Sequence, residues 1–500
     1  MTLKVKAEST HGWTAEAEMQ TRGTNIRSFR DPEGQVVITD ERVLRFVSET
    51  GFDDLHEFLK SDTARRFLES GYLVQTRFLC AEEVGQLNGI GKLLLGLGTA
   101  RVTVVEHQKV SFQSFPYEWP PEMLYEAGCL TLDLAESLLD EGFGIKDATP
   151  YNVLYRGPRP VFVDLLSFER RNQGDPVWVP YSQFVRTFLL PLLANKYFGL
   201  PLDQLLLCRR DGLEPEEVYR LCGTLRKLNP VFLELVSAPK WLATRRDDDD
   251  TSIYQQKTLD NPDKAKFILQ SLFKRLRRLL NSVKPERGKG SRWSDYLTFN
   301  NYSAEHFAAK QRFVEEVLIE FKPRRVLDAG CNTGHFSLIA AQHGSEVVAI
   351  DYDPMVIGEL WSRCADEKIN VLSLVVNLSR PTPGMGWRNQ ECAAFLDRSR
   401  RKFDAVMMLA LIHHLLVSER IPLEEIIDLA AELTTDLLII EYIDPADSMF
   451  RRLVRGRDNL HTDLTAEKFE SVCQLRFDIV RTQHFNETSR WLYLLRKKHE

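Results

Sequence analysis

Cysteine is scarce in this sequence, and no two cysteines stand close together. The 500 residues hold eight of them, each isolated, so no C-x-x-C pair marks a zinc site. This spacing predicts reduced thiols in a cytoplasmic protein. The first residues, MTLKVKAESTHGWTAEAEM, lack the apolar run of a signal peptide, so we expect no export.

Long apolar runs are also missing. The most apolar stretch, residues 184–207, is interrupted by Arg186, Pro191, Lys196 and Pro201 before a single helix could cross a bilayer. We therefore expect no transmembrane segment. The stretch is predicted to form buried helices of a soluble domain.

No sign of charge dominates the chain. It has 65 Lys and Arg against 71 Asp and Glu, a formal net charge of −6, and we find no basic face or aromatic recognition motif. A nucleic-acid partner is therefore not expected. A chain of 500 residues exceeds what one core usually organises, so we expect two or three domains.

The clearest boundary separates two unlike halves, residues 1–240 and residues 293–500. The connector between them, residues 241–292, contains the acidic run 247–250, a basic helix and the segment KPERGKGS. Few of its residues could serve a core. The connector is therefore predicted to be a charged linker.

Within the connector, residues 262–283 have the pattern of a basic amphipathic helix. Basic residues stand beside an apolar face formed by Ile268, Leu272, Leu276, Leu279 and Val283. Such a helix could make a peripheral contact with an acidic membrane surface. Alternatively, and in the interpretation that we favour, it packs its apolar stripe on a neighbouring element and leaves its charges in water.

The C-terminal half alternates strand and helix patterns. The segments RRVLDAG, SEVVAIDYD, FDAVMMLAL and DLLIIEYI read as apolar strands, and HFSLIAAQHG reads as the helix after the first of them. This alternation predicts a Rossmann-like, doubly wound and mostly parallel sheet with helices on both faces.

The first strand runs into a glycine-containing turn, VLDAGCNTGHF. Gly330 and Gly334 supply the turn, and Asn332 belongs to the few residue types that tolerate a positive φ. Asp351 closes the next strand about twenty residues later, where a carboxylate can accept hydrogen bonds from ribose hydroxyls. A nucleoside ligand is expected, although these features alone also fit a dinucleotide-binding domain.

Residues 293–498 resemble the class I S-adenosylmethionine-dependent methyltransferases. VLDAGCNTG is similar to their first motif, VVAIDYDP to their second-strand motif and FDAVMMLALIHHLL to their fourth-strand motif. The resemblance implies that Asp328 and the glycine loop hold the methionine part of S-adenosylmethionine and that Asp351 holds the ribose. It also places Asn377 near the adenine amino group.

Methyl transfer needs a base only when the nucleophile is protonated, because the sulfonium is already a good leaving group. His413 and His414 follow the fourth strand, and an unperturbed imidazole titrates near neutrality, so one of them could deprotonate a hydroxyl. The alternative, which we favour, is that these histidines bond to backbone or cover the cofactor. Glu441, at the end of the fifth strand pattern, is a further candidate.

The N-terminal half contains a second set of candidate site residues, in GIKDATPYNVLYRGPRPVFVDLLSFE. Asp147, Asn152 and Asp164 stand on loops flanking short strands, and their oxygens could gather around magnesium. The spacing resembles the catalytic loop of the α+β protein-kinase-like fold, over at most residues 25–240. By that resemblance, Asp147 would orient or deprotonate an acceptor hydroxyl, while Asn152 and Asp164 would hold magnesium on the phosphates of ATP.

This second resemblance is incomplete. Residues 145–146 are Ile-Lys where kinases have His-Arg, and residues 165–166 are Leu-Leu where kinases have Phe-Gly. The predicted hairpin 31–47 has no glycine-rich phosphate loop and offers Arg42 and Arg45 in place of the kinase lysine. Both an active phosphotransfer site and a degenerate or structural lobe stay open.

Together the two halves are similar to a group of large bacterial methyltransferases related to the nodulation protein NoeA. The leading hypothesis is methyl transfer to an unidentified acceptor, with a small molecule or glycan favoured and the N-terminal half recognising it or regulating the reaction. A second hypothesis is a bifunctional kinase and methyltransferase. A third is a binding or scaffold protein with two vestigial sites.

Overall fold

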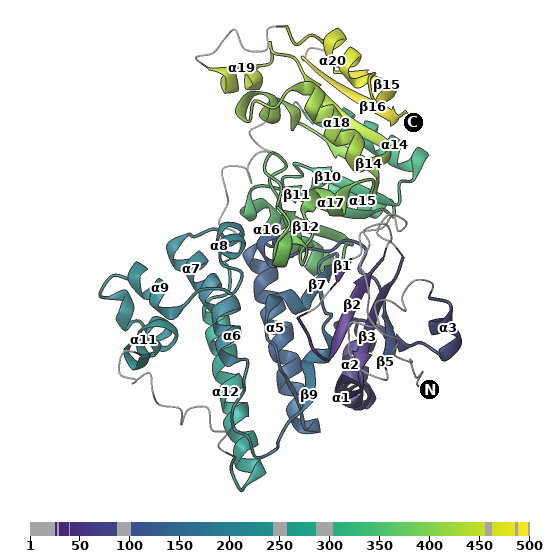
Figure 1. Cartoon of the computed structure of the whole chain (residues 1–500). Helices are drawn as coiled ribbons and strands as arrows, with labels where there is room; N and C mark the ends of the chain where they lie inside the picture. The colour runs from purple at the N-terminus through teal and green to yellow at the C-terminus, as the bar shows by residue number, and fades with distance from the viewer. Residues whose placement is uncertain are drawn as a thin grey trace.

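The computed structural model describes residues 26–27, 30–39, 41–87, 102–243, 258–286, 304–455, 463–485 and 489–498. The N-terminal and C-terminal halves are stacked along the long axis of the molecule (Figure 1).

The N-terminal half begins with a five-stranded antiparallel sheet in the order β1-β2-β3-β5-β4. The strands are β1 (Ile26–Arg27), β2 (Gly34–Ile38), β3 (Val43–Ser48), β4 (Thr76–Phe78) and β5 (Val102–His107). Helices α1 (Glu49–Lys60) and α2 (Asp62–Glu69) follow β3, and α3 (Ala81–Gly85) follows β4. Ser48 and Ser61 begin the first two helices, because each hydroxyl accepts a backbone N–H of the first turn.

A mainly helical region follows this sheet. Its strands form two short antiparallel pairs, β6 (Phe143–Ile145) with β9 (Phe168–Arg170) and β7 (Val153–Arg156) with β8 (Arg159–Phe162). Its α-helices are α5 (Pro121–Leu138), α6 (Tyr181–Phe184), α7 (Leu190–Phe198), α8 (Leu202–Cys208), α9 (Pro215–Leu221), α10 (Pro230–Phe232), α11 (Ala238–Ala243) and α12 (Pro262–Ser282).

The apolar stretch 184–207 forms buried helices, as its sequence predicts. It is divided among α6, a π-helical turn (Val185–Leu189), α7 and α8, with Gly199 in the left-handed region where α7 ends. In the part of the chain that the structure describes, no helix combines the length and the apolar character needed to cross a membrane.

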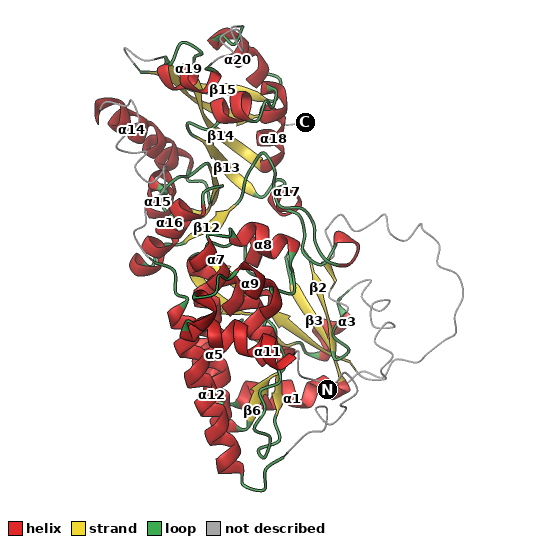
Figure 2. Ribbon diagram, turned by 90° about the vertical axis from the view of Figure 1, so that its left-hand side faces the viewer, coloured by secondary structure: helices red, strands yellow, loops and turns green. Residues whose placement is uncertain are grey.

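Helix α12 lies beside α5 for much of its length (Figures 1 and 2). Its buried face consists of Ala265, Leu269, Phe273, Leu276, Leu279 and Leu280. The N-terminal part of this face differs from the predicted stripe, because Ile268 is exposed. Arg277 forms ion pairs with Asp133 and Glu136 of α5, so basic charge on the helix is engaged by the protein itself. This geometry corresponds to the packing alternative.

The C-terminal half contains a seven-stranded sheet in the order β12-β11-β10-β13-β14-β16-β15. The first five of these are parallel neighbours, and β16 is antiparallel to both of its neighbours. The strands are β10 (Arg325–Ala329), β11 (Glu346–Asp351), β12 (Val371–Val375), β13 (Phe403–Met408), β14 (Thr434–Ile443), β15 (Phe477–His484) and β16 (Arg490–Lys497). The predicted strand and helix alternation is confirmed.

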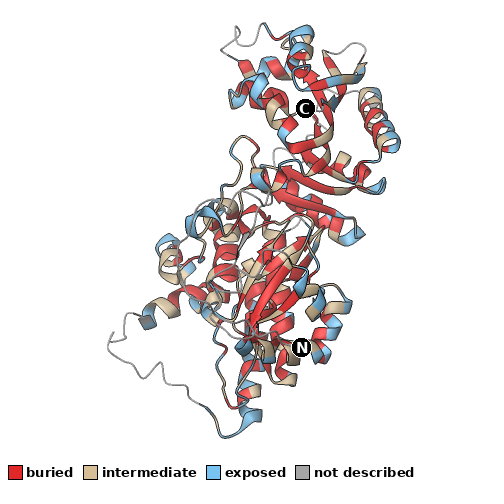
Figure 3. Cartoon of the chain, turned by 45° about the vertical axis from the view of Figure 1, so that its right-hand side comes forward, coloured by how far each residue is buried: buried red, intermediate tan, exposed pale blue. Residues whose placement is uncertain are grey.

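Successive residues of the central strands point to opposite faces of this sheet. Val326 and Val347 join a cluster with α14 (Ala304–Phe321), α15 (His335–Gln342) and α16 (Pro354–Glu367). Leu327 and Val348 join the cluster that contains α17 (Phe395–Ser399), α18 (Leu423–Leu433), α19 (Ser448–Val454) and α20 (Ala466–Cys473). Helices therefore cover both faces, and the strands lie in the buried interior (Figure 3).

The two halves share one apolar core. The larger cluster of buried side chains runs from the N-terminal half into the C-terminal sheet, and Phe112 packs against the rings of Phe395 and Phe403. Helix α5 also packs on α16, where a Cβ atom on Gly358 would lie 2.4 Å from a carboxylate oxygen of Glu122. Apolar and polar side chains of the two halves are therefore in direct contact across the interface.

Candidate functional site

The first motif forms the turn between β10 and α15. Gly330, Asn332 and Gly334 have φ of +75°, +51° and +77°, so the asparagine takes the left-handed conformation expected of it. The backbone N–H groups of Gly330 and Cys331 both donate to the carbonyl of Ile350, which ties the turn to the end of β11. These bonds fix the loop before any ligand arrives.

Asp328 lies beneath this turn, at the end of β10. Its side chain is buried and accepts a hydrogen bond of 2.5 Å from the Ser337 hydroxyl on α15. Burial raises the pKa of Asp328 to about 6, and the Ser337 hydroxyl and the Lys310 ammonium only partly offset that effect. A cationic group nearby would favour its ionised form.

Asp351 ends β11 and faces the glycine turn. One carboxylate oxygen accepts the Asn332 N–H at 3.0 Å, and the other accepts the Asp353 N–H at 3.1 Å. Burial raises the pKa of Asp351, although the two backbone donors lower it in part. Each oxygen has further lone pairs, so the carboxylate can accept two hydroxyl groups without releasing the loop.

Asn377 lies just beyond β12, on the same edge of the sheet. Its side-chain oxygen accepts the N–H of Ser379 at 2.9 Å and the Ser379 hydroxyl at 2.7 Å. The oxygen therefore shapes the local turn, which leaves the amide nitrogen as the group that could contact a ligand.

The two histidines follow β13 at the start of a π-helical turn (His414–Ser418), with ring centroids 4.2 Å apart. Burial, together with the nearby His414 ring and the cations of Arg490 and Lys310, holds the pKa of His413 well below its usual range. Burial also lowers the pKa of His414. In the described part of the chain, the buried Nδ1 atom of His413 has no hydrogen-bond partner. These surroundings favour the neutral form of His413.

Glu441 on β14 is completely buried. Its carboxylate lies 2.6 Å from the Lys310 ammonium and 3.7 Å from the Arg490 guanidinium. A carboxylate held between two buried cations is a poor proton acceptor. The geometry therefore argues against Glu441 as the base and assigns it to holding Lys310 and Arg490 in place.

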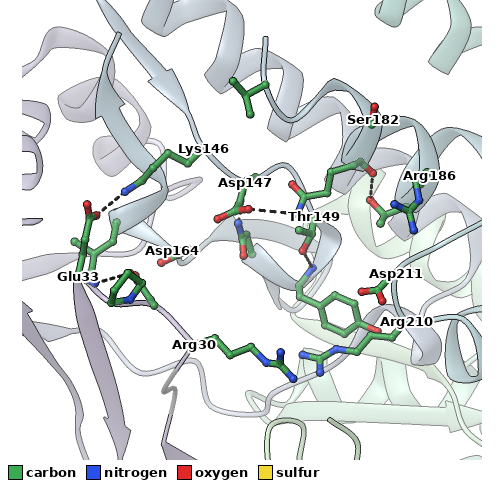
Figure 4. Close-up of a pocket in the computed structure, with 18 residues that line it drawn as sticks. Arg30, Glu33, Lys146, Asp147, Thr149, Asp164, Ser182, Arg186, Arg210 and Asp211 are labelled. Atoms are coloured by element: carbon green, nitrogen blue, oxygen red, sulfur yellow. Dashed lines mark hydrogen bonds and ion pairs between the residues drawn. The ribbon is translucent and has the colours of Figure 1, made fainter. Parts of the chain in front are cut away.

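A second site lies in the N-terminal half. A cavity of about 1070 Å³ is lined by Asp147, Asn152 and Asp164 together with residues of the β1–β2 connection and of α6 (Figure 4). The three residues predicted to act together thus share one cavity. The Asn152 amide donates to the Asp147 carbonyl at 3.0 Å and to the Ser167 hydroxyl at 3.2 Å.

Asp164 is paired inside the protein. Arg45 of β3 donates to its carboxylate at 2.7 Å, and the Ser167 hydroxyl does so at 2.6 Å. Burial would raise the pKa of Asp164, but these two partners outweigh it and lower the pKa. Among the described residues, no group of three His, Cys, Asp or Glu side chains is placed to hold a metal ion.

An apolar slot of about 320 Å³ adjoins this cavity. Its walls come from β2, β3, the segment after β5 and the β7–β8 pair, and its apolar members include Val36, Ile38, Val43, Val74, Val110, Phe115, Leu154 and Val163. Two residues of the C-terminal half, Glu391 and Cys392, also line the slot. No sequence pattern indicated their involvement, because they lie in a connecting segment far along the chain.

Basic residues of the cavity were missed for the same reason. Arg30, Arg186 and Arg210 all line it, but they stand far apart in sequence and match no motif; Lys146, directly before Asp147, lines it as well. Lys146 pairs with Glu33 at 2.5 Å and Arg186 with Glu214 at 2.8 Å.

Two sequence comparisons find proteins similar to this chain. The family profile described as a methyltransferase domain matches residues 301–486. The curated nodulation protein NoeA of Rhizobium meliloti (strain 1021) is 30% identical over 469 residues, which cover 93% of this chain and 94% of NoeA.

Solved structures match part of the chain. They include the N-methyltransferase NodS of Bradyrhizobium japonicum WM9 in complex with S-adenosyl-L-homocysteine, at 14% identity over 40% of this chain and 90% of that one, with a TM-score of 0.30. The PH0226 protein of Pyrococcus horikoshii OT3 matches at 16% identity over 42% of this chain and 100% of that one, also with a TM-score of 0.30. From the family profile and the full-length relative, the chain belongs to the family of the nodulation protein NoeA and is an S-adenosylmethionine-dependent methyltransferase with a class I methyltransferase fold.

Proposed function

We propose that the turn after β10 and the acid that ends β11 form the methyl-donor site. The observation that carries this proposal is the direct hydrogen bond between the Asp351 carboxylate and the Asn332 N–H, which joins the ribose-binding candidate to the glycine turn. Asp351 would accept the ribose hydroxyls, and Asp328 would favour the cationic methionine part. The proposed donor-binding residues are Asp328, Gly330, Asn332, Gly334, Asp351 and Asn377.

We further propose that the methyl acceptor is a small molecule or a glycan and that the reaction takes place in the cytoplasm. The formal net charge of −6 gives no overall attraction for a polyanion, and all eight cysteines are free thiols, as suits a reducing compartment. A neutral His413 beside the fourth strand fits a role in hydrogen bonding to the acceptor or covering the donor. We therefore assign alignment, rather than proton removal, to the histidine pair.

Calorimetric titration of the full-length protein with S-adenosylmethionine tests the donor site. Asp351→Ala removes the carboxylate, and we expect a loss of donor affinity of about 10- to 100-fold, since hydrogen bonds to charged groups contribute about 1.5–3 kcal/mol. Glu359→Gln, on an exposed position of α16, is the matched control and should bind like the wild type. Absence of donor binding by the folded wild-type protein would refute the assignment.

A second function is favoured by the N-terminal cavity. The five-stranded antiparallel sheet, the apolar slot and the cavity with Asp147, Asn152 and Asp164 support a protein-kinase-like lobe that binds a nucleotide. In that role Asp147 would orient an acceptor hydroxyl, and Asn152 and Asp164 would hold magnesium on ATP. Arg45 would supply the cation that a lysine supplies in kinases, because it already contacts Asp164.

This function makes the protein a bifunctional kinase and methyltransferase of a glycan or small molecule. Its test is ATP binding with magnesium, measured with S-adenosyl-L-homocysteine present at saturation so that nucleotide cannot enter the donor site. Asp164→Asn should abolish the magnesium dependence of binding. If the wild type binds no ATP under these conditions, the lobe is structural or serves only acceptor recognition.

A further inference from the structure

The N-terminal cavity is completed by the methyltransferase half. Glu391 belongs to the segment that follows β12, yet its carboxylate reaches Arg30, on the β1–β2 connection, with an Nε–Oε1 distance of 2.5 Å. The second oxygen accepts a hydrogen bond from Arg210. Figure 4 shows the two guanidinium groups close together at one side of the cavity. One carboxylate thus bridges two cations from separate parts of the N-terminal half.

The local backbone allows Glu391 and Arg210 to approach each other closely. A Cβ atom on Gly386 would lie 2.2 Å from an oxygen of Glu391 and 2.7 Å from the Arg210 guanidinium, so only glycine allows this approach. Arg210 in turn lies over the Tyr151 ring, with 5.1 Å from its guanidinium carbon to the ring centroid. Burial would raise the pKa of Glu391, but Arg30 and Arg210 outweigh it and keep the carboxylate ionised.

Two converging guanidinium groups are a preferred partner for a phosphate, which accepts the same paired hydrogen bonds as a carboxylate and carries more charge. The position of the two arginines relative to the apolar slot and the polar cavity indicates what kind of phosphate fits. Both Arg30 and Arg210 line the apolar slot and the polar cavity alike. A ligand with a flat apolar ring in the slot would therefore place its phosphates beside them.

We propose that Arg30 and Arg210 bind a phosphate group of a nucleoside polyphosphate and that Glu391 is an internal counter-ion which this phosphate displaces. The proposal rests on the second function given above, a nucleotide site in the N-terminal half. It adds that the methyltransferase half competes with the nucleotide for the same two arginines.

A displacement of Glu391 can affect the proposed donor site, because one chain segment joins them. The segment from Asn377 to Glu391 is continuous, and two backbone hydrogen bonds between Met385 and Cys392 close its outer part into a short hairpin. Thr382 anchors the inner part through a 2.5 Å hydrogen bond from its hydroxyl to Glu118. Movement of Glu391 would be transmitted along a short tethered segment to the proposed adenine contact at Asn377.

The decisive experiment is calorimetric titration of full-length wild type and Glu391→Gln with ADP and magnesium, in the presence of saturating S-adenosyl-L-homocysteine. Glutamine keeps the shape of the side chain and removes its charge. We expect ADP affinity to rise about tenfold in Glu391→Gln and adenosine affinity to stay unchanged, while Arg210→Met weakens ADP binding. Glu419→Gln, which removes a carboxylate paired with the exposed Arg380 of the same half, should behave like the wild type.

Each other outcome overturns a defined part of the proposal. Equal or weaker ADP binding by Glu391→Gln, with the wild type binding ADP, rejects the competition and leaves the nucleotide site standing. If the wild type and every variant bind S-adenosyl-L-homocysteine but neither ADP nor adenosine, the nucleotide site itself is rejected. If Glu391→Gln gains affinity for glucose 1-phosphate and inorganic phosphate but not for ADP, the phosphate does not belong to a nucleotide. The two arginines then bind a phosphorylated acceptor. Thermal melting of each variant shows that the halves remain folded.

Discussion

A buried ion pair joins the two halves, between Arg398 of α17 and Glu118, just before α5. The side chain of Arg398 is 5% exposed and that of Glu118 is 0% exposed. The Glu118 carboxylate also accepts the Phe115 N–H at 3.1 Å and the Thr382 hydroxyl at 2.5 Å. The Arg398 guanidinium lies over the ring of Phe115, 4.9 Å from its centroid. Both charges are therefore fully engaged.

Removing one charge from this pair should cost far more than removing one from the surface. Arg398→Met leaves the Glu118 carboxylate buried without its cation, and breaking a buried pair in this way costs about 3–5 kcal/mol. The matched control is Arg400→Met two residues along, because Arg400 pairs with Glu432 where the side chains are 60% and 53% exposed. An exposed pair contributes about 0–1 kcal/mol. The double variant Arg398→Met with Glu118→Gln should recover much of the loss.

Urea unfolding followed by tryptophan fluorescence and circular dichroism measures these differences. Because the halves share a core, we expect one coincident transition in the wild type and, in Arg398→Met, a lower midpoint with separate transitions for the two probes. A loss of less than about 1 kcal/mol in Arg398→Met, equal to that of Arg400→Met, would show that the interface does not depend on this pair.

Three further predictions concern the donor site. Burial raises the pKa of Asp328 from 3.8 to about 6, so ionising this group lowers the free energy of unfolding by about 3 kcal/mol. The stability that the protonated carboxyl group contributes is fully present below about pH 4 and is lost as the pH rises through 6. Asp328→Asn should therefore raise the urea midpoint at pH 7.5, and the gain should shrink towards pH 5; an equal gain at both would contradict this. Gly334→Ala should lower the melting temperature by several degrees, because its Cβ would lie 2.3 Å from Leu360, whereas Gly344→Ala, which also has positive φ but meets nothing within 4 Å, should cost less. The ring carbons of His413 should show no titration between pH 5 and 8 by NMR of ¹³C-histidine protein, and a midpoint near 6.5 would refute its neutral state.

The sequence predicted the C-terminal fold well because its signals are local. An apolar strand, a turn that requires left-handed residues and an acid at the end of the next strand all lie within about thirty residues, and the parallel register of β10 and β11 brings them together. The roles of Asp328, Asp351 and Asn377 in binding stay predictions. The placement of Asp147, Asn152 and Asp164 in one cavity followed from a local motif in the same way.

Features that depend on contacts between distant segments could not be predicted. Glu441 was a candidate base, but its pairing with Lys310, 131 residues earlier, is invisible in the sequence. The connector helix was predicted to belong to a linker, and its periodicity did not show that α5 would cover it. Arg398 lies 280 residues from Glu118, so nothing local indicated that the halves share a core.

The segment after β12 explains why the two halves are packed so closely. It begins at Asn377 beside the proposed donor site, contacts Glu118 through Thr382, places Glu391 against Arg30 and Arg210, and ends in the helix that carries Arg398. A flexible tether would allow Glu391 to leave the two arginines without moving Asn377. The Glu118 anchors on either side of the hairpin prevent that, since Thr382 precedes it and Arg398 follows it. A ligand that competes with Glu391 must therefore either strain this segment or shift it as a unit, and both alternatives would couple the N-terminal cavity to the proposed methyl-donor site.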